Sequence, residues 1–345
     1  MPSLSELILD PAEAQLLAIV GEREIRPQDW ATGRPVRSTR DALLRRGELL
    51  LGERRLDWDA AFESLVARGI LERHFDTYVL ADRARPQVTL LRRELAARIF
   101  GERLCRAAAS PAYGELSDRV LGPGLRAFSL VDPEQMDALI EGLALEPDQR
   151  ALDVGCGLGT LTESVAAATG AHLTGIDLAS SAIAMAIERC RNDDRLSFSC
   201  GDAQDLEPVI GPFDAIMAVD SLYFMDDLDA TVARLRELIK STGRLAALVS
   251  DVLPEEISDR DYPAENTTLG RVLARQGFSF SARSFTENER AIWERQLVEA
   301  GALAGRFAAE GNKDLCDELI REAERTLGWC EGGRVRRFLF VAQPV

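Results

Sequence analysis

The chain has 345 residues, 46% of them hydrophobic, and a net charge of −16 at pH 7. This length exceeds one ordinary core and predicts at least two domains. The acidic balance argues against a nucleic-acid partner, because phosphates need a basic surface. We expect no membrane partner, since no apolar run approaches the ~20 residues of a span, and the acidic first ten residues do not resemble a signal peptide.

The six cysteines show no C-x-x-C pair and no clustering with histidine. A structural zinc site needs such clusters, so we expect no metal. The pattern is typical of free thiols in a reducing compartment, and we expect a cytoplasmic location.

Residues 1–110 are predicted to form a mainly helical domain. Apolar residues at helical spacing cover 7–20 and 61–66, and two short apolar strands follow within 67–73 and 77–80. This order resembles a winged-helix unit, for which DNA binding is one hypothesis. Because acidic and basic residues are nearly balanced here, we favour dimerisation or a cover over an active site.

Residues 86–145 are predicted to be helical, and 111–145 are expected to connect the two domains. A long amphipathic pattern covers 88–104. Asp132 is the expected N-cap of a later helix, with Pro133 at its first position.

From residue 149 onward, strand and helix patterns alternate, which predicts a parallel sheet with right-handed crossovers. Strands are expected near 151–155, 172–177, 196–200, 214–219 and 244–249, with helices near 160–169, 179–191 and 228–240. A helix at 264–276, a strand at 278–284, a helical pair at 286–330 and a last strand at 337–342 complete the second domain, 146–345.

A glycine-rich turn follows the first of these strands, in the run Ala151-Leu152-Asp153-Val154-Gly155-Cys156-Gly157-Leu158-Gly159-Thr160. Glycines let a ligand lie against bare backbone. The third glycine comes two residues after the second, not the three of a dinucleotide fingerprint, and no phosphate-binding Gly-Lys-Ser/Thr follows. Asp153 would repel a phosphate and suits a cationic amine. We therefore expect a nucleoside that carries a positive charge.

This run resembles motif I of the class I S-adenosylmethionine (SAM) dependent methyltransferases, and later segments resemble further motifs, over residues 111–250. Asp177 ends the second strand, where an acid accepts the ribose hydroxyls. An alternative is that Asp177 caps the next helix, although Ser180 and Ser181 fit that role. The resemblance implies an α/β fold with a Rossmann-like seven-stranded methyltransferase sheet, a helical N-terminal domain and a helical insertion at 286–330.

The resemblance also implies site residues. Asp202 and Ala203 would meet the adenine, whereas Asp205 is interpreted as a helix cap. The segment 213–225 resembles motif IV, whose end faces the transferred methyl, and 239–245 resembles a structural turn. The implied cofactor-binding residues are Asp153, Gly155, Cys156, Gly157, Gly159, Asp177, Leu178, Asp202, Ala203, Val219, Tyr113 and Phe128, the last two closing over the sulfonium by cation–π contact.

Histidine, the usual general base, is nearly absent: His74 lies in the first domain and His172 lies early in the second strand. We expect Asp220, Ser221 and Tyr223 nearest the methyl, with Tyr223 and Asp220 holding or polarising an amine or an acidic carbon. Core packing is an equal alternative for Tyr223. This predicts N- or C-methylation of a small molecule in secondary metabolism, with S-adenosylhomocysteine as product.

Other hypotheses use the same site. SAM could be cyclised with release of methylthioadenosine, or the chain could be a SAM-sensing regulator. The first domain is a candidate homodimer contact. Aromatic and acidic residues of the insertion form either a pocket for a cationic amine or ordinary helical core: Trp293, Phe307, Trp329, Glu289, Glu294, Glu310 and Asn312.

Overall fold

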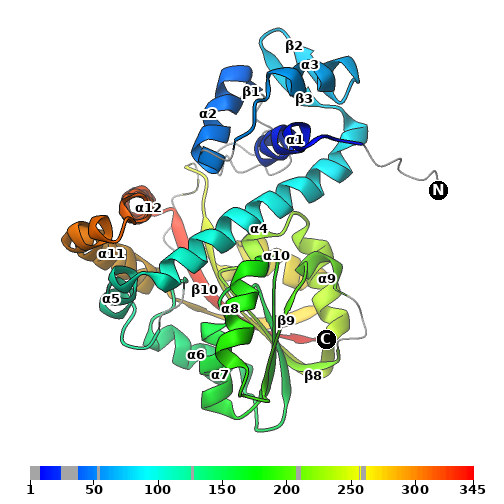
Figure 1. The fold of residues 1–345 in the computed structure, drawn as a ribbon. Helices are drawn as coiled ribbons and strands as arrows, with labels where there is room; N and C mark the ends of the chain where they lie inside the picture. Colours follow the sequence, from blue (N-terminus) through cyan, green and yellow to red (C-terminus); the bar gives the residue numbers. More distant parts are fainter. Residues whose placement is uncertain are drawn as a thin grey trace. The chain divides into compact units, whose positions relative to one another are not determined.

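The computed structural model describes residues 8–24, 38–52, 55–125, 128–206, 211–255, 257 and 262–345. The chain divides into two compact units, Met1–Phe100 and Gly101–Val345 (Figure 1). The division falls inside the long helix α4 (Arg85–Ala109), earlier than the expected boundary at residue 110. Leu7, the first residue of the first predicted helix, lies outside the described residues.

The smaller unit has the helix, strand and hairpin order of a winged-helix unit. Its elements are α1 (Pro11–Glu24), β1 (Ser38–Thr39), α2 (Arg40–Leu51), α3 (Asp59–Ala67), β2 (Leu71–His74), β3 (Thr77–Leu80) and the 3₁₀ turn η2 (Asp82–Ala84). The strands form an antiparallel sheet in the order β1-β3-β2. Gly69, at a left-handed φ of 61°, follows the end of α3. Trp58 and Phe62 belong to a hydrophobic core within this unit.

The larger unit is built on a seven-stranded sheet. Its strands are β4 (Arg150–Val154), β5 (His172–Asp177), β6 (Leu196–Cys200), β7 (Phe213–Val219), β8 (Ile239–Val252), β9 (Phe278–Ser284) and β10 (Val335–Pro344). The spatial order is β6-β5-β4-β7-β8-β10-β9. Strand β10 runs antiparallel to both of its neighbours, and the other pairs are parallel. The Rossmann-like seven-stranded sheet predicted from the sequence is confirmed, but the sheet is mixed and not wholly parallel, because β10 enters it in the opposite direction.

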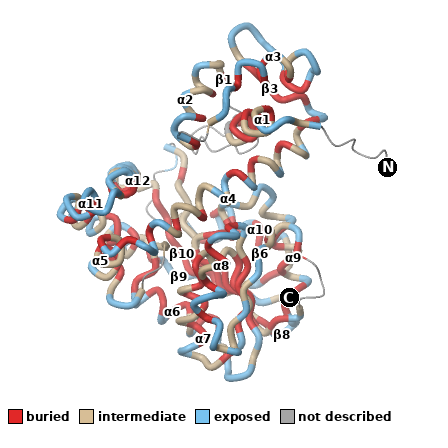
Figure 2. Tube along the Cα trace, viewed as in Figure 1, coloured by how far each residue is buried: buried red, intermediate tan, exposed pale blue. Residues whose placement is uncertain are grey.

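Helices cover both faces of this sheet, as Figure 1 shows. They are α5 (Pro111–Val120), α6 (Pro133–Leu143), α7 (Thr160–Thr169), α8 (Ser180–Cys190), α9 (Leu228–Leu238), α10 (Thr268–Arg275), α11 (Thr286–Ala309) and α12 (Lys313–Glu331). In β7, Ala215 and Met217 pack with α6 and α7, whereas Ile216 and Ala218 pack with α9 and α10. A parallel strand buried on both faces reads as a continuous apolar run, and the central strands β4 and β7 are among the most buried parts of this unit, whereas the edge strands β6 and β9 are largely exposed (Figure 2).

Two boundaries differ from the sequence analysis. The helix expected at 264–276 is split into a 3₁₀ turn, η6 (Ala264–Asn266), and α10, because the Thr267 hydroxyl accepts from the Gly270 amide at 3.0 Å and caps a new helix. The turn expected at 239–245 is part of β8, which pairs Ile239 with Phe213 across a register shift. The first difference comes from a local capping bond, whereas in the second the pairing with β7 overrides the local pattern.

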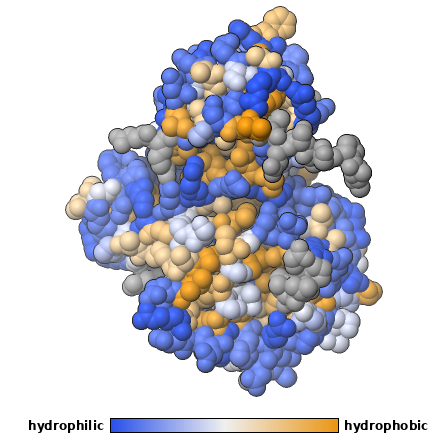
Figure 3. Space-filling model, turned by 45° about the vertical axis from the view of Figure 1, so that its right-hand side comes forward, coloured by the Kyte–Doolittle hydropathy of each residue, from blue (hydrophilic) through white to orange (hydrophobic). Residues whose placement is uncertain are grey.

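The predicted cap of α6 is confirmed, since the Asp132 carboxylate accepts from the Gln135 amide at 2.9 Å and Pro133 begins the helix. The surface in Figure 3 is largely hydrophilic, with hydrophobic atoms gathered in patches on the face turned forward. Across the described ranges, no helix combines the length and the apolar character that crossing a membrane requires.

Candidate functional site

The glycine-rich turn joins β4 to α7 at the carboxyl end of the sheet. Gly155, Gly157 and Gly159 all have left-handed φ, at 76°, 53° and 74°. A Cβ on Gly155 would lie 2.4 Å from the Cβ of Ser221, and one on Gly159 would lie 2.5 Å from the ring of Phe198. A side chain at either of these two positions would therefore clash with a neighbouring residue and would also strain the left-handed backbone.

The first three backbone amides of this turn have acceptors within the protein. The amides of Gly155 and Cys156 both donate to the Ile176 carbonyl, at 2.8 and 3.0 Å. The Gly157 amide donates to Asp177 Oδ2 at 2.9 Å. Protein acceptors thus already hold these amides, and the turn is fixed to β5 before any ligand binds.

Asp177 ends β5 and faces the turn. Its Oδ1 accepts from the Ala179 amide at 2.8 Å. Ala179 is the N-cap residue of α8 and makes no side-chain cap, so neither Ser180 nor Ser181 has the capping role suggested for it. An ionised carboxylate has about four acceptor positions, and two backbone bonds leave capacity for ribose hydroxyls. Leu178, beside it, is 37% exposed.

Asp153 lies at the other side of the turn, in β4, and is 3% exposed. Its Oδ2 accepts from the Thr162 hydroxyl at 2.6 Å. Burial raises the pKa of Asp153 to about 7; the Thr162 bond opposes this shift and the charge of Asp177 adds to it. An ammonium group near this carboxylate would favour its ionised form.

The turn after β6 also differs from one prediction. Asp202 caps the 3₁₀ turn η3 (Ala203–Asp205) by accepting from the Gln204 amide at 2.9 Å. Asp205 is the last residue of this turn and does not cap it, and the segment 207–210 that follows lies outside the described residues. Ala203 is buried next to the cap. The adenine-binding role of Asp202 and Ala203 stays a prediction.

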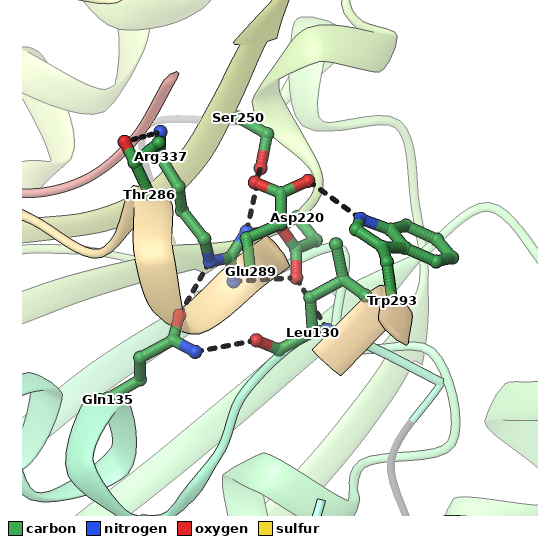
Figure 4. Close-up of polar contacts among 8 residues, drawn as sticks. All are labelled: Leu130, Gln135, Asp220, Ser250, Thr286, Glu289, Trp293 and Arg337. Atoms are coloured by element: carbon green, nitrogen blue, oxygen red, sulfur yellow. Dashed lines mark hydrogen bonds and ion pairs between the residues drawn. The ribbon is translucent and has the colours of Figure 1, made fainter. Parts of the chain in front are cut away.

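At the end of β7, Asp220 takes part in a buried ion pair that the sequence did not reveal. It has an unusual left-handed φ of 51°. Arg337, on β10, donates to both of its oxygens, Nη1 to Oδ1 at 2.6 Å and Nη2 to Oδ2 at 3.1 Å. The Leu130 amide also donates to Oδ2, at 3.1 Å (Figure 4). With these three bonds, the geometry fits a positioning role for Asp220.

Arg337 ties several elements to this point. Its Nε donates to the Gln135 side chain of α6 at 2.5 Å, and Nη1 also donates to the Ser250 hydroxyl of β8 at 2.9 Å. The Gln135 amide nitrogen in turn donates to the Leu130 carbonyl at 2.8 Å. We call these residues, with Asp220 and Glu289, the Arg337 network (Figure 4). Sequence signals for it were lacking, because the strand pattern does not indicate which distant side chains Arg337 meets.

The next two predicted catalytic residues follow Asp220 directly. The Ser221 hydroxyl is buried and donates to the Val154 carbonyl at 2.6 Å, which holds this loop against the glycine-rich turn. Tyr223 lies in the 3₁₀ turn η5 (Leu222–Phe224). Burial, with Asp220 and other nearby carboxylates, raises the pKa of Tyr223 well above 10, so its phenol keeps its proton at pH 7 and can donate a hydrogen bond. Val219, also a predicted site residue, is buried at the end of β7.

The two aromatic residues expected to close over a sulfonium lie together. The rings of Tyr113 and Phe128 stack with centroids 5.7 Å apart and an angle of 18°. The Arg103 guanidinium lies 4.8 Å from the Phe128 centroid, so a cation of the protein already occupies one cation–π position. Burial raises the pKa of Tyr113 above its usual value, and this phenol is neutral as well.

Some of the residues singled out in the helical insertion pack in the core or lie at the surface, and others contact the Arg337 network. Phe307 lies in the core shared by α5, α11 and α12. Glu310 accepts from the Ser110 hydroxyl and the Ala112 amide, which makes it part of the cap of α5. Glu294 is exposed and pairs with Arg290, and Trp329 lies under Arg325. Of this set, Glu289 and Trp293 face the Arg337 network, with Trp293 Nε1 donating to Glu289 at 3.0 Å.

Neither histidine belongs to this arrangement. His172 begins β5, at the end of the strand opposite Asp177, and is partly exposed beside Asp148. His74 is exposed on β2 in the smaller unit. The sequence-based exclusion of His172 from the ligand end of the sheet is confirmed.

Known proteins with a similar sequence are methyltransferases. A family model described as a methyltransferase domain matches residues 151–243. The chain is 32% identical over 134 residues to methyltransferase GfsG of Streptomyces halstedii, covering 36% of this chain and 48% of that protein. It is 27% identical over 238 residues to phosphoethanolamine N-methyltransferase 1 of Triticum aestivum, covering 65% and 47%. The chain thus spans about half the length of these curated relatives.

Among solved structures, the fold is similar to phosphoethanolamine N-methyltransferase 2 of Haemonchus contortus in complex with phosphomonomethylethanolamine and S-adenosylhomocysteine. The TM-score is 0.57 at 21% identity, covering 71% of this chain and 60% of that one. The [4+2]-cyclase SpnF matches with a TM-score of 0.54 at 20% identity, covering 72% and 97%. At these identities, the likeness shows the fold alone.

The strand order, the glycine-rich turn and the acid at the tip of β5 define the larger unit as an α/β methyltransferase fold. With the matching family model, this identifies it as a class I SAM-dependent methyltransferase domain. SAM is the cofactor of this family, and the residues present fit it. Asp177 retains acceptor capacity for the hydroxyls of a ribose. A cationic amine next to the buried Asp153 carboxylate would offset the energetic cost of burying its negative charge.

Proposed function

We propose that this chain transfers the methyl group of SAM to a small-molecule acceptor, at an amine nitrogen or an acidic carbon, in secondary metabolism. The observation that carries the proposal is the contact between the 220–223 loop and the glycine-rich turn. Ser221 donates to Val154 and packs on Gly155, so Tyr223 lies on a loop that borders the cofactor turn. The loop that the family resemblance predicts to face the methyl group is thus adjacent to the turn that it predicts to bind SAM.

Bound SAM supplies a methyl group already activated by its sulfonium, so the protein mainly orients the acceptor and excludes water. The neutral phenol of Tyr223 donates a hydrogen bond that orients the acceptor. Because both oxygens of Asp220 are held by Arg337, it positions this loop. No histidine lies at this edge, which favours an acceptor that needs no strong base.

Binding of the donor is tested by calorimetry with Asp177→Asn. Asparagine loses the charged acceptor for the ribose, and hydrogen bonds to charged groups are worth about 1.5–3 kcal/mol, so SAM affinity should fall ~10- to 100-fold. Asp205→Asn, one strand away in η3, is the matched control and should bind SAM as the wild type does. Wild-type protein that is folded but takes up neither SAM nor S-adenosylhomocysteine would refute the proposal.

The reaction itself is identified by its co-product. Incubation with SAM and a panel of small amines and acidic carbon compounds, beginning with phosphoethanolamine, should yield S-adenosylhomocysteine by mass spectrometry. Methylthioadenosine would instead indicate cyclisation. Tyr223→Phe should lower turnover about tenfold or more and leave SAM affinity within about twofold, because the hydroxyl acts on the acceptor. Equal kinetics in the two proteins would remove Tyr223 from the mechanism.

We further propose that the smaller unit forms a homodimer and binds no DNA. The support is that this unit has its own hydrophobic core, as a separate contact module would, and a near balance of acidic and basic residues instead of a basic surface. Light scattering of the full chain and of a chain lacking residues 1–84 compares the two masses. A dimeric full chain that becomes monomeric on truncation supports the proposal, and salt-sensitive retention on DNA contradicts it.

A further inference from the structure

The Arg337 network contains an unbalanced charge. Among its described members, one guanidinium lies with two carboxylates, and all three are buried. The side chain of Arg337 is 0% exposed and that of Asp220 is 9% exposed, while Glu289 is 2% exposed. Asp220 is paired with Arg337. Glu289 accepts only from neutral donors, the Ser250 hydroxyl at 2.7 Å and Trp293 Nε1 at 3.0 Å.

A buried carboxylate without a counter-ion is unfavourable, so Glu289 must either take up a proton or lie near a bound cation. Burial raises the pKa of Glu289, and the charge of Asp220 adds to this shift. Arg337 and the two hydrogen bonds oppose the shift and do not cancel it. Glu289 is therefore easier to protonate than an exposed glutamate.

The other titratable groups that face Glu289 are either ion-paired or neutral. They come from three elements: Arg337 on β10, Tyr223 in η5 with Asp220 before it, and Cys330 on α12. Burial raises the pKa of Cys330 to about 12 and that of Tyr223 well above 10, so both are neutral. Asp220 is held in its ion pair. Glu289 is thus the member of this group whose charge responds to a ligand.

This charge lies beside the reaction edge of the sheet. Asp220 immediately precedes Ser221, which contacts the glycine-rich turn. The electrostatic influence of Glu289 reaches Tyr223, on the loop that is expected to face the methyl. A cation bound at this edge therefore experiences the field of Glu289 through a water-poor interior.

We propose that Glu289 supplies the counter-charge for the sulfonium of SAM and makes the site select this charged donor over its neutral product. The inference rests on the proposed function, because it takes SAM as the donor. In the transfer, the acceptor's lone pair forms the new bond to the methyl carbon, and sulfur keeps the electron pair of the broken bond. Sulfur thereby becomes a neutral thioether. The acceptor atom gains the positive charge and releases its N–H or C–H proton, and Glu289, which no longer faces a sulfonium, takes up that proton. Loss of the counter-charge then weakens retention of S-adenosylhomocysteine.

The test compares SAM with S-adenosylhomocysteine by calorimetry of the full chain. The two ligands share every ionisable group, so contributions from Asp153 and Asp177 cancel in the difference, and the sulfonium remains. Measurements in buffers of different ionisation enthalpy should show that SAM releases more protons, up to about one, than its product does. Below its raised pKa, Glu289 is protonated and SAM must displace the proton. The ratio of SAM to product affinity should therefore rise as pH increases through this raised pKa.

The variant Glu289→Gln keeps hydrogen-bonding atoms at the same place and removes the charge. We expect it to lose the additional proton release, to show a flat pH dependence of the affinity ratio, and to prefer SAM about tenfold less than the wild type does. Glu294→Gln, on the same helix but exposed and paired with Arg290, is the matched control and should behave as the wild type.

Equal proton release by the two ligands in the wild-type protein would overturn the inference, as would a wild-type affinity ratio in a folded Glu289→Gln variant. The wild-type comparison decides the matter even if the variant does not fold. Absence of binding by either ligand contradicts the proposed function instead, so the two failures are distinguishable.

Discussion

Removing the guanidinium of Arg337 should destabilise the larger unit strongly. Arg337→Met keeps the apolar stem and leaves Asp220, with its side chain 9% exposed, as a buried carboxylate without a counter-ion. Gln135 and Ser250 lose a donor as well. Breaking one side of a buried ion pair typically costs about 3–5 kcal/mol, and we expect a loss of that size in the free energy of unfolding.

Urea unfolding followed by tryptophan fluorescence measures this loss, because Trp293 lies beside the network. Adding Asp220→Asn to Arg337→Met removes the unpaired charge, and asparagine tolerates the left-handed φ at this position. The double variant should therefore be more stable than Arg337→Met by about 1–3 kcal/mol.

The control variant is Arg275→Met, whose partner Asp229 is exposed, and its unfolding midpoint should barely change. The reasoning would be refuted if Arg337→Met lost less than about 1 kcal/mol in the free energy of unfolding, or if the double variant were no more stable than Arg337→Met. Either result would mean that Arg337 does not stabilise a buried charge on Asp220.

Two further predictions concern the cofactor turn. Because the pKa of Asp153 is raised to about 7 when folded, against about 3.9 in an unfolded chain, its protonated form stabilises the fold below about pH 4 and this contribution is lost as pH rises to 7. The stability of the wild type relative to Asp153→Asn, which still accepts from Thr162, should therefore fall between these pH values in thermal unfolding; a constant difference would contradict the shift. Gly155→Ala should lower the melting temperature and abolish SAM binding, because its Cβ would lie 2.4 Å from Ser221 and its φ is left-handed. Gly301→Ala, in an open helical position of α11, should instead leave SAM binding intact and slightly raise stability, by about 1 kcal/mol or less.

Local patterns were sufficient to predict the sheet and its cofactor turn. Strand β5 and helix α7 have the bounds expected from the sequence, because periodicity and the glycine-rich turn are properties of adjacent residues. The position of Asp177 at the tip of β5 follows from the strand pattern alone. The split at Thr267 was missed, because a single capping hydroxyl decided it.

Only the tertiary structure decided how the polar residues near the end of β7 are used. Asp220 could be predicted as a site residue from motif IV, but its partner Arg337 lies 117 positions away along the chain, and nothing in an apolar strand indicates which side chain it meets. Glu289 and Trp293 have the pattern of an amphipathic helix, and packing turned them toward this network while Phe307 lies in the core. Neighbouring residues in the sequence determine the strand, the turn and the helix. The charges that come together depend on which distant elements pack against each other, and burial then sets their energies.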